Sequence, residues 1–230
     1  MMLSVAPSPS PKPLSADRAR EHLATGILAG RIGPSEKINI KTVAEEIDVS
    51  LGAVREALSR LAAEGFVTSL PQKGYCAAPV SRTDLTQLTE ARVEIETTCA
   101  CLSLARGDVE WESEVAAAYH ALTRTDERVP GDATGAMSPD WARVHGRFHD
   151  AIARGCGNAW LLSLRQTLFA QSERYRRLSY PLSRAKRDIP GEHRLLFEAV
   201  MARDEARTAE ALSSHLNRTA EMILNSEFLA

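Results

Sequence analysis

The sequence predicts a mostly α-helical protein: an N-terminal winged helix-turn-helix with a small β-hairpin wing, then a C-terminal all-α antiparallel helical bundle. Three observations lead to this fold class. Apolar residues recur at helical spacing through most of the 230 residues, strand patterns occur only between residues 66 and 78, and turn residues separate the periodic segments. The content of 44% apolar and 25% charged residues is that of an ordinary globular protein, and the length allows two domains.

The first domain is expected over residues 14–79. Its first helix places Ala19, Leu23 and Ile27 on one apolar stripe, and Gly65 is suited to end its third helix. The order of helix, helix, turn, helix and hairpin is that of a winged helix-turn-helix. The predicted elements are helices at 14–29, 40–47 and 51–64 and strands at 66–70 and 75–78.

The second domain is expected over residues 80–230, where the strand patterns disappear. Ser138 followed by Pro139, and Asn158 after Gly155, are good helix starts. The string Asp204-Glu205-Ala206-Arg207 indicates that the last helical segment breaks into an antiparallel pair. The predicted helices are 84–106, 109–128, 139–154, 158–179 and 192–225, the last one broken near residue 204.

The remaining bulk features indicate a cytoplasmic protein. Residues 1–13 are rich in proline and serine and are expected to form a disordered tail rather than a signal peptide. No apolar run approaches the roughly 18 residues of a membrane span. The four cysteines form no CxxC pair and are expected to be reduced, mostly buried thiols; they are Cys76, Cys99, Cys101 and Cys156.

The start of the third predicted helix has the features of a DNA-recognition helix. Ser50 is placed to cap the helix and to contact a phosphate, and the small Gly52 lets the helix approach the bases closely. Arg55 lies one turn further on and is long enough to contact guanine O6 and N7 together. Lys41, on the helix that crosses the backbone, and Lys73-Gly74 at the hairpin tip are expected to contact phosphates or the minor groove.

An alternative without DNA binding also fits these residues. The net charge of the chain is −2, and residues 14–79 carry eight basic and eight acidic side chains, so the domain is not basic overall. In that case Arg55 would form an ion pair with Glu56 or Glu45 on a solvated helix face.

Several short strings of the first domain match one family of regulators. They are Gly30 to Pro34, Val43 to Glu45, Val49-Ser50, Val54 to Leu58, Leu61, Glu64 to Val67 and Gly74. With these strings the chain resembles the GntR family of bacterial regulators, and the resemblance implies DNA binding. In that family an Arg usually follows the Ser, and Thr-Pro comes next. Here Leu51 and Gly52-Ala53 occupy those positions, so a different operator is expected, with Leu51 near a thymine methyl group.

Four of the six histidines have a spacing that suits a metal site. His145 and His149 are four residues apart on one helix face, where two imidazoles can reach one ion. His193 and His215 lie on either side of the break near residue 204, so an antiparallel helix pair brings them to the same height. The alternative is that all four make ordinary hydrogen bonds at helix surfaces.

The second domain resembles the FadR-type C-terminal domain known as FCD. The matching residues are Arg92 to Glu96, Phe148-His149, Gly157-Asn158, Glu192-His193, Arg203-Asp204 and His215. This resemblance implies a divalent metal held by an Asp-like residue and three histidines, with His145 at the Asp position. A neutral ligand set of His145, His149, His193 and His215 favours zinc or nickel. The resemblance also implies that Arg92 clamps a carboxylate effector, and the alternative is an ion pair between Arg92 and Glu96 one helical turn further on. Arg174 and Tyr175 are weaker candidates for the effector site.

These expectations combine into a ligand-responsive transcription regulator rather than an enzyme. The resemblance to a subgroup of carbon-starvation-induced regulators points to a short dicarboxylate such as glutarate, and release from DNA by the effector implies a repressor. A homodimer on a two-fold operator is expected, because one helix-turn-helix reads few base pairs. A metal-dependent hydrolase using the His-rich site is the main alternative, although the chain has no HExxH and no Gly-x-Ser-x-Gly string. A structural or interaction protein with an unused DNA module is a third.

Overall fold

The computed structural model describes residues 14–129, 131, 137–180, 187–226 and 229. The chain divides into two compact units, Met1–Ala78 and Pro79–Ala230. The tail expected at residues 1–13 lies outside the described residues.

The N-terminal unit contains three helices that pack around a small core. They are α1 (Ser15–Leu28), α2 (Ile40–Glu46) and α3 (Leu51–Ala63). Side chains cap two of them: the Asn39 carboxamide accepts from the first backbone amides of α2, and Ser50 Oγ accepts from Ala53 N at 3.1 Å. Helix α1 packs on α3, and Leu23 of α1 and Val54 and Leu58 of α3 are completely buried. These contacts fix α3 against α1 and leave its outer face in solvent.

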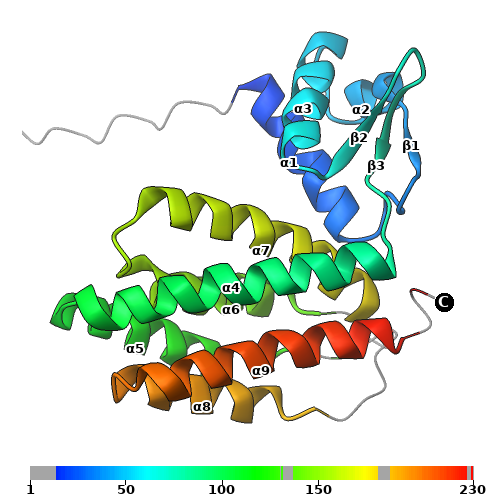
Figure 1. Ribbon diagram of the computed structural model, residues 1–230. Coiled ribbons are helices and arrows are strands. Elements are labelled where there is room, and N and C mark those ends of the chain that lie inside the picture. Colours follow the sequence, from blue (N-terminus) through cyan, green and yellow to red (C-terminus); the bar gives the residue numbers. More distant parts are fainter. Residues whose placement is uncertain (1–13, 130, 132–136, 181–186, 227–228, 230) are drawn as a thin grey trace, which may run out of the picture. The chain divides into compact units, whose positions relative to one another are not determined.

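A three-stranded antiparallel sheet completes this unit (Figure 1). Strands β2 (Val67–Leu70) and β3 (Gly74–Ala77) form the expected hairpin, and β1 (Lys37–Ile38) adds to the free edge of β3. Strand β1 was not predicted from the sequence, because a strand of two residues with only one buried side chain shows no alternation of apolar and polar residues. At the hairpin tip Gly74 has a φ of 92°, in the left-handed region that glycine adopts without strain.

The C-terminal unit is the expected bundle of antiparallel helices. In Figure 1 the long α4 runs through its middle and packs against α7 on one side and α9 on the other. Helix α6 also packs on α4, and α5 on α6. The helices are α4 (Arg82–Arg106), α5 (Val109–Thr123), α6 (Pro139–Arg154), α7 (Ala159–Ser179), α8 (Ile189–Met201) and α9 (Glu205–Leu224).

The expected break near residue 204 is confirmed. Arg203 has a φ of 52°, and the Asp204 carboxylate accepts from Arg207 N at 3.0 Å, which starts α9. Two other boundaries differ from the expectation by three residues or more. Helix α8 begins at Ile189 rather than 192 because Asp188 caps Gly191 N, and α5 ends at Thr123 rather than 128. Beyond residue 85 the described residues contain one isolated bridge, Arg128 to Met137, and no strand.

The main core lies where α5, α6, α8 and α9 meet. Phe148, Leu196 and Val200 are completely buried in it. Trp111 adds a directional link, because its indole Nε1–H donates to the Ala151 carbonyl at 2.8 Å and so joins α5 to α6. None of the helices in the described part of the chain is long and apolar enough to cross a membrane.

Replacement of Trp111 should measure this link. Trp111→Ala removes a buried aromatic side chain and should lower the free energy of unfolding by about 3–5 kcal/mol. Trp111→Phe keeps most of the apolar contact but leaves the Ala151 carbonyl unpaired, at a cost of about 1–3 kcal/mol. Urea unfolding followed by circular dichroism gives both values. The control is Val109→Ala at an exposed position, which should stay within about 0.5 kcal/mol of wild type. A Trp111→Ala variant as stable as this control would contradict the assignment.

Candidate metal centre and DNA-contacting surface

Four buried histidines converge inside the C-terminal unit. Helix α6 presents His145 and His149 one turn apart, with ring centres 4.6 Å from each other. The α8–α9 hairpin brings His193 and His215 together, at 4.7 Å between ring centres. The rings of His149 and His215 stack at 5.2 Å, which closes the group across the two helix pairs.

The nitrogen atoms of these rings fit a divalent metal ion. One nitrogen from each of the four rings lies within 4.8 Å of the other three. His145 Nδ1, both nitrogens of His149 and His193 Nε2 have no hydrogen-bond partner among the described residues, although all are buried. Unpaired buried polar atoms cost about 1–3 kcal/mol each, and a metal ion would satisfy several of them at once. The residues present therefore fit the metal that the sequence predicted.

The surroundings hold these histidines in the neutral form that metal ligands require. Burial lowers the pKa of His145, His149 and His193 well below the usual value, and the neighbouring cationic side chains lower it further. Burial also lowers the pKa of His215, against the opposing effect of its hydrogen bond to Glu192. Near neutral pH these rings are uncharged, so the ion does not have to displace protons from them.

Glu192 orients one of the four rings. Its carboxylate accepts from His215 Nδ1–H at 2.9 Å, which leaves Nε2 as the atom available to a metal. Arg187 binds the same carboxylate and also donates to the His215 carbonyl at 2.9 Å. Although burial alone would raise it, the hydrogen bonds from His215 and Arg187 lower the pKa of Glu192 to about 2. A carboxylate that is ionised at neutral pH thus fixes the orientation of the His215 ring.

A second ion-paired network borders the site on the side of α4 and α7. The Glu96 carboxylate accepts from Arg92 and, at 3.2 Å, from Arg165 Nε. Arg165 also donates to Asp150, the residue after His149, and is only 1% exposed. Burial raises the pKa of Glu96, but the charges of Arg92 and Arg165 outweigh this and hold it below its usual value. The network joins α4, α6 and α7 beside the histidines.

The predicted effector residues Arg92, Arg174 and Tyr175 lie in two different places, and none of them lines the cavity beside the histidines. A cavity of about 20 Å³ next to His145 and His215 is lined by Arg176 and Arg187, and not by Arg92. Arg92 instead donates to Glu96 and to Ser172 Oγ at 2.6 Å. Arg174 and Tyr175 belong to α7 and contact the start of α4. Tyr175 Oη accepts from Ser81 N at 3.1 Å, and Arg174 lies 3.9 Å from Asp84.

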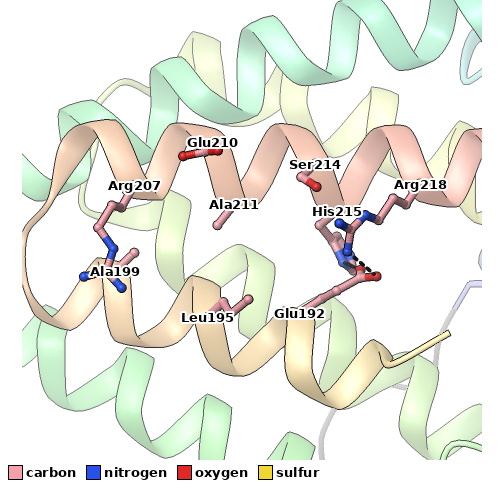
Figure 2. A pocket seen from close by; sticks show the side chains of 9 residues that line it. All are labelled: Glu192, Leu195, Ala199, Arg207, Glu210, Ala211, Ser214, His215 and Arg218. Carbon is pink, nitrogen blue, oxygen red and sulfur yellow. Dashed lines mark hydrogen bonds and ion pairs between the residues drawn. The ribbon is translucent and has the colours of Figure 1, made fainter.

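A larger groove reaches the same site from the outside, between α8 and α9. Its volume is about 300 Å³. Figure 2 shows Glu192 and His215 at one end of the groove, with Arg218 reaching over Glu192, and Arg207 near the other end. The groove therefore leads from the surface to the Glu192–His215 pair, whose side chains are themselves buried.

In the N-terminal unit the predicted DNA-contacting residues of the recognition helix share an exposed surface. Leu51, Gly52 and Arg55 project from the first two turns of α3, and Leu51 is 44% exposed despite being apolar. Arg55 makes no ion pair with any described residue, because Glu56 pairs with Arg60 and Glu45 pairs with Lys41. The ion pair that would have explained Arg55 without DNA is thus absent from this part of the structure.

The other predicted contacts are also at the surface. Lys41 is at the start of α2, with its side chain 79% exposed and 3.7 Å from Glu45. Lys73 and Gly74 form the exposed tip of the β2–β3 hairpin. Ser50 uses its hydroxyl oxygen as the α3 cap, as expected.

Comparison with known proteins agrees with both units. The family model "Bacterial regulatory proteins, gntR family" matches residues 15–76, and the model of the FCD domain matches residues 87–218. The chain belongs to the GntR family. Its two domains are the DNA-binding domain of that family and an FCD domain of the FadR-like type, so the protein is a DNA-binding transcription regulator.

Two curated relatives align along most of the chain. The HTH-type transcriptional repressor GlaR of Escherichia coli K12 is 37% identical over 201 residues, which cover 84% of this chain and 89% of the relative. The uncharacterized HTH-type transcriptional regulator BphR of Paraburkholderia xenovorans LB400 is 32% identical over 203 residues, covering 88% and 82%.

Two solved structures share the fold. Escherichia coli McbR/YncC superposes with a TM-score of 0.74 at 19% identity and covers 93% of this chain and 98% of its own. A GntR regulator from Rhodococcus sp. RHA1 superposes with a TM-score of 0.68 at 20% identity, covering 91% and 97%. At these identities the likeness concerns the fold alone.

The sequence analysis did not identify three residues that shape the site of this GntR protein. Glu192 directly precedes His193, and its position next to a candidate ligand was the signal available. Arg165 is the one charged residue between Ala159 and Ser172, which marks it as a buried charge. Arg187 stood in a segment without any periodic pattern, and nothing in the sequence pointed to it.

The depressed pKa values predict how stability depends on pH. Below about pH 6.5 the unfolded chain protonates its histidines, whereas the folded metal-free protein keeps these four neutral, so the free energy of unfolding should fall as the pH is lowered from 7 to 5. Each such histidine adds up to about 1.4 kcal/mol per pH unit to that slope. Urea unfolding of metal-free protein measures it. A His149→Leu/His193→Leu variant should lose about half of this histidine-dependent slope, and an identical slope in both proteins would refute the prediction.

Proposed function

We propose that this regulator is a metal-dependent repressor that binds its operator as a homodimer and leaves it when a small carboxylate binds beside the metal. The observation that carries the proposal is a group of four buried, neutral imidazoles in the FCD domain of a DNA-binding chain, three of them with nitrogens that have no hydrogen-bond partner among the described residues. Repression is also what the name of the GlaR relative states of that protein.

The metal would be held by His145, His149, His193 and His215. Four neutral nitrogen donors suit zinc or nickel better than magnesium or calcium, which prefer oxygen ligands. When bound, the ion supplies positive charge and an anion-coordinating position. The nearby arginines supply little net charge of their own, since Arg92, Arg165, Arg176 and Arg187 are each paired with a carboxylate. The net attraction for an anion would therefore come from the ion.

The effector would bind in the small cavity next to His145 and His215. A space of about 20 Å³ holds about one water molecule, so a carboxylate compound has to enlarge it. Arg176 and Arg187 line the cavity and are the nearest guanidinium donors, whereas the expected clamp by Arg92 would require it to exchange Glu96 for the effector. An effector that binds only the enlarged form shifts the bundle toward that form, with a typical coupling of about 1–3 kcal/mol to the DNA sites.

The hydrolase alternative finds less support at this site. A metal hydrolase needs a general base near the bound water. The two buried carboxylates nearest the histidines, Glu96 and Glu192, are held by arginines and have lowered pKa values. Such groups are weak bases, which favours sensing over turnover.

DNA binding is tested by two substitutions with different signatures. Arg55→Ala should weaken operator binding by about 1–3 kcal/mol and relax base preference, because a bidentate base contact is lost. Lys73→Ala should weaken binding to all sequences and lower the salt slope by about one, as for a phosphate contact. Fluorescence anisotropy on the DNA flanking its own gene, at several salt concentrations, separates the two effects. Arg31→Ala in the same unit is a control of equal charge. Unchanged affinity and base preference in Arg55→Ala would show that α3 does not read the bases.

The metal and effector claims are tested together. Elemental analysis after reconstitution with zinc or nickel should find one ion per wild-type chain and none in His149→Ala/His193→Ala. Calorimetry with glutarate as probe should show binding to the metal-loaded wild type only, weakened at least about tenfold by Arg187→Ala. Arg143→Ala, at an exposed ion pair of α6, is the control. If Arg92→Ala weakens glutarate binding instead, Arg92 is the residue that binds the carboxylate. If glutarate affinity is unaltered in both Arg92→Ala and Arg187→Ala, neither residue binds it. Metal-free wild type after reconstitution would disprove the metal site.

A further inference from the structure

Tyr175, which the sequence analysis assigned to the effector site, lies where the chain enters the C-terminal unit. Its hydroxyl accepts from Ser81 N at 3.1 Å and donates to the Asp84 carboxylate. Ser81 caps α4, since its Oγ accepts from Asp84 N at 3.1 Å. This unit begins at Pro79, so Ser81 and Asp84 belong to the first helical turn after the connection to the DNA-binding domain. Tyr175 therefore holds the turn to which that domain is attached.

The packing around Tyr175 keeps its hydroxyl in place and protonated. The side chain is completely buried in a small apolar cluster with Leu85 and Ile223. Burial and the hydrogen bond to Asp84 raise the pKa of Tyr175 to about 12. The hydroxyl is therefore a hydrogen-bond donor to Asp84 throughout the neutral pH range.

Arg174, the preceding residue, has hydrogen-bonding capacity that the structure does not use. It is 3% exposed, and its Nε and Nη1 are buried without a partner among the described residues. A buried guanidinium without a hydrogen-bonded carboxylate is costly. The Asp84 carboxylate is 3.9 Å from Arg174 Nη2, just beyond hydrogen-bond distance. Asp84 thus has two alternative partners, and in this structure it is bonded to Tyr175.

The same turn of α7 borders the proposed effector cavity. Arg176 lines that cavity together with His145 and is bound to Glu173 at 2.7 Å. Its guanidinium lies 5.2 Å from the ring centre of Trp141. Arg174 and Arg176 are two residues apart, which places them about 200° apart around the helix axis. One turn of α7 therefore faces the cavity on one side and the start of α4 on the other.

We propose that Asp84 exchanges Tyr175 for Arg174 when the effector enlarges the cavity, and that this exchange carries the signal toward the DNA-binding domain. Displacement of α7 on its Arg176 side shifts it against the start of α4, so that Ser81 and Asp84 leave Tyr175 and a charge-assisted bond to Arg174 forms. The inference rests on the proposed function and adds its route of regulation. Tyr175 is the positioning residue of the effector-free form, and Arg174 that of the effector-bound form.

The first test removes the second partner of Asp84. Saturating glutarate should raise the operator Kd of metal-loaded wild type by about 5–150-fold. In Arg174→Met, which keeps an unbranched side chain without its charge, the rise should be less than about twofold, while calorimetry still finds glutarate bound. Arg154→Met, at an arginine of α6 with a 67% exposed side chain, is the control and should respond like wild type. If glutarate releases Arg174→Met as it releases wild type, the proposal is wrong.

The second test removes the first partner and needs no effector. Tyr175→Phe keeps the ring but not the hydroxyl, so Asp84 pairs with Arg174 in the free protein. Without glutarate its operator Kd should be at least about fivefold above that of wild type, and glutarate should change it little. Tyr119→Phe, at a tyrosine whose ring is stacked on Phe197, is the matched control. A wild-type operator affinity in Tyr175→Phe would overturn the exchange.

A third measurement follows the contact itself. Hydrogen exchange of the Ser81 amide, which donates to Tyr175, should become faster when glutarate is added to wild type and stay unchanged in Arg174→Met. Unchanged exchange in a wild type that glutarate releases from its operator would also contradict the proposal. Helical circular dichroism and a wild-type metal content establish that the variants are folded. The proposed function fails separately, if glutarate leaves the operator affinity of wild type unaltered, because Tyr175→Phe tests the exchange without an effector.

Discussion

The C-terminal domain depends on a single constraint, the burial of four imidazoles, three of which have nitrogens without a hydrogen-bond partner among the described residues. Burial of an unpaired polar atom is expensive, and here it falls on His145, His149 and His193 inside the bundle. Burial keeps these rings neutral, and their neighbours hold the group in place: Glu192 fixes the tautomer of His215, and the stacking of His149 on His215 limits rotation. Several imidazole nitrogens of such a core lack partners within the described part of the protein, and one cation could bind more than one of them. The helices are therefore arranged around a group of candidate metal ligands as much as around apolar contacts.

The order of elements was predictable from the sequence because local signals carry it. The spacing of Leu23, Val54 and Leu58 predicts buried helix faces, and Asp204 marks the break that brings His193 and His215 together. The two-residue strand β1 was not predictable, since it exists only through pairing with β3. Helix limits such as the start of α8 depended on a cap, Asp188, in a segment without periodicity.

The convergence of the four histidines was predictable from the sequence, but the electrostatics around them were not. Spacing and resemblance together indicated the four histidines. His145 and His149 are one helical turn apart, and a helical hairpin pairs His193 with His215, so both pairs follow from local geometry. The partners of Arg92 were not decided by spacing, since Glu96 at one turn and a distant effector are both within its reach. The structure shows Glu96 in contact, and it introduces Arg165, which is 69 residues from Glu96 in sequence. Long-range ion pairs of this kind follow from the packing of α4 on α7, which no local pattern specifies.

Helix α7 connects three regions that the chain separates. Its buried Arg165 holds Asp150, the neighbour of His149; its Tyr175 holds Ser81, where the chain enters the C-terminal unit; and its Trp160 points outward. A rigid helix rotates about its axis as a whole. A rotation of α7 that changes the contacts beside the histidines would therefore also change the position of Trp160 and the hydrogen bond between Tyr175 and Ser81. Because the DNA-binding domain is joined to the C-terminal unit through the backbone next to Ser81, a rotation of α7 would alter the histidine surroundings, this junction and the outer face of the helix together.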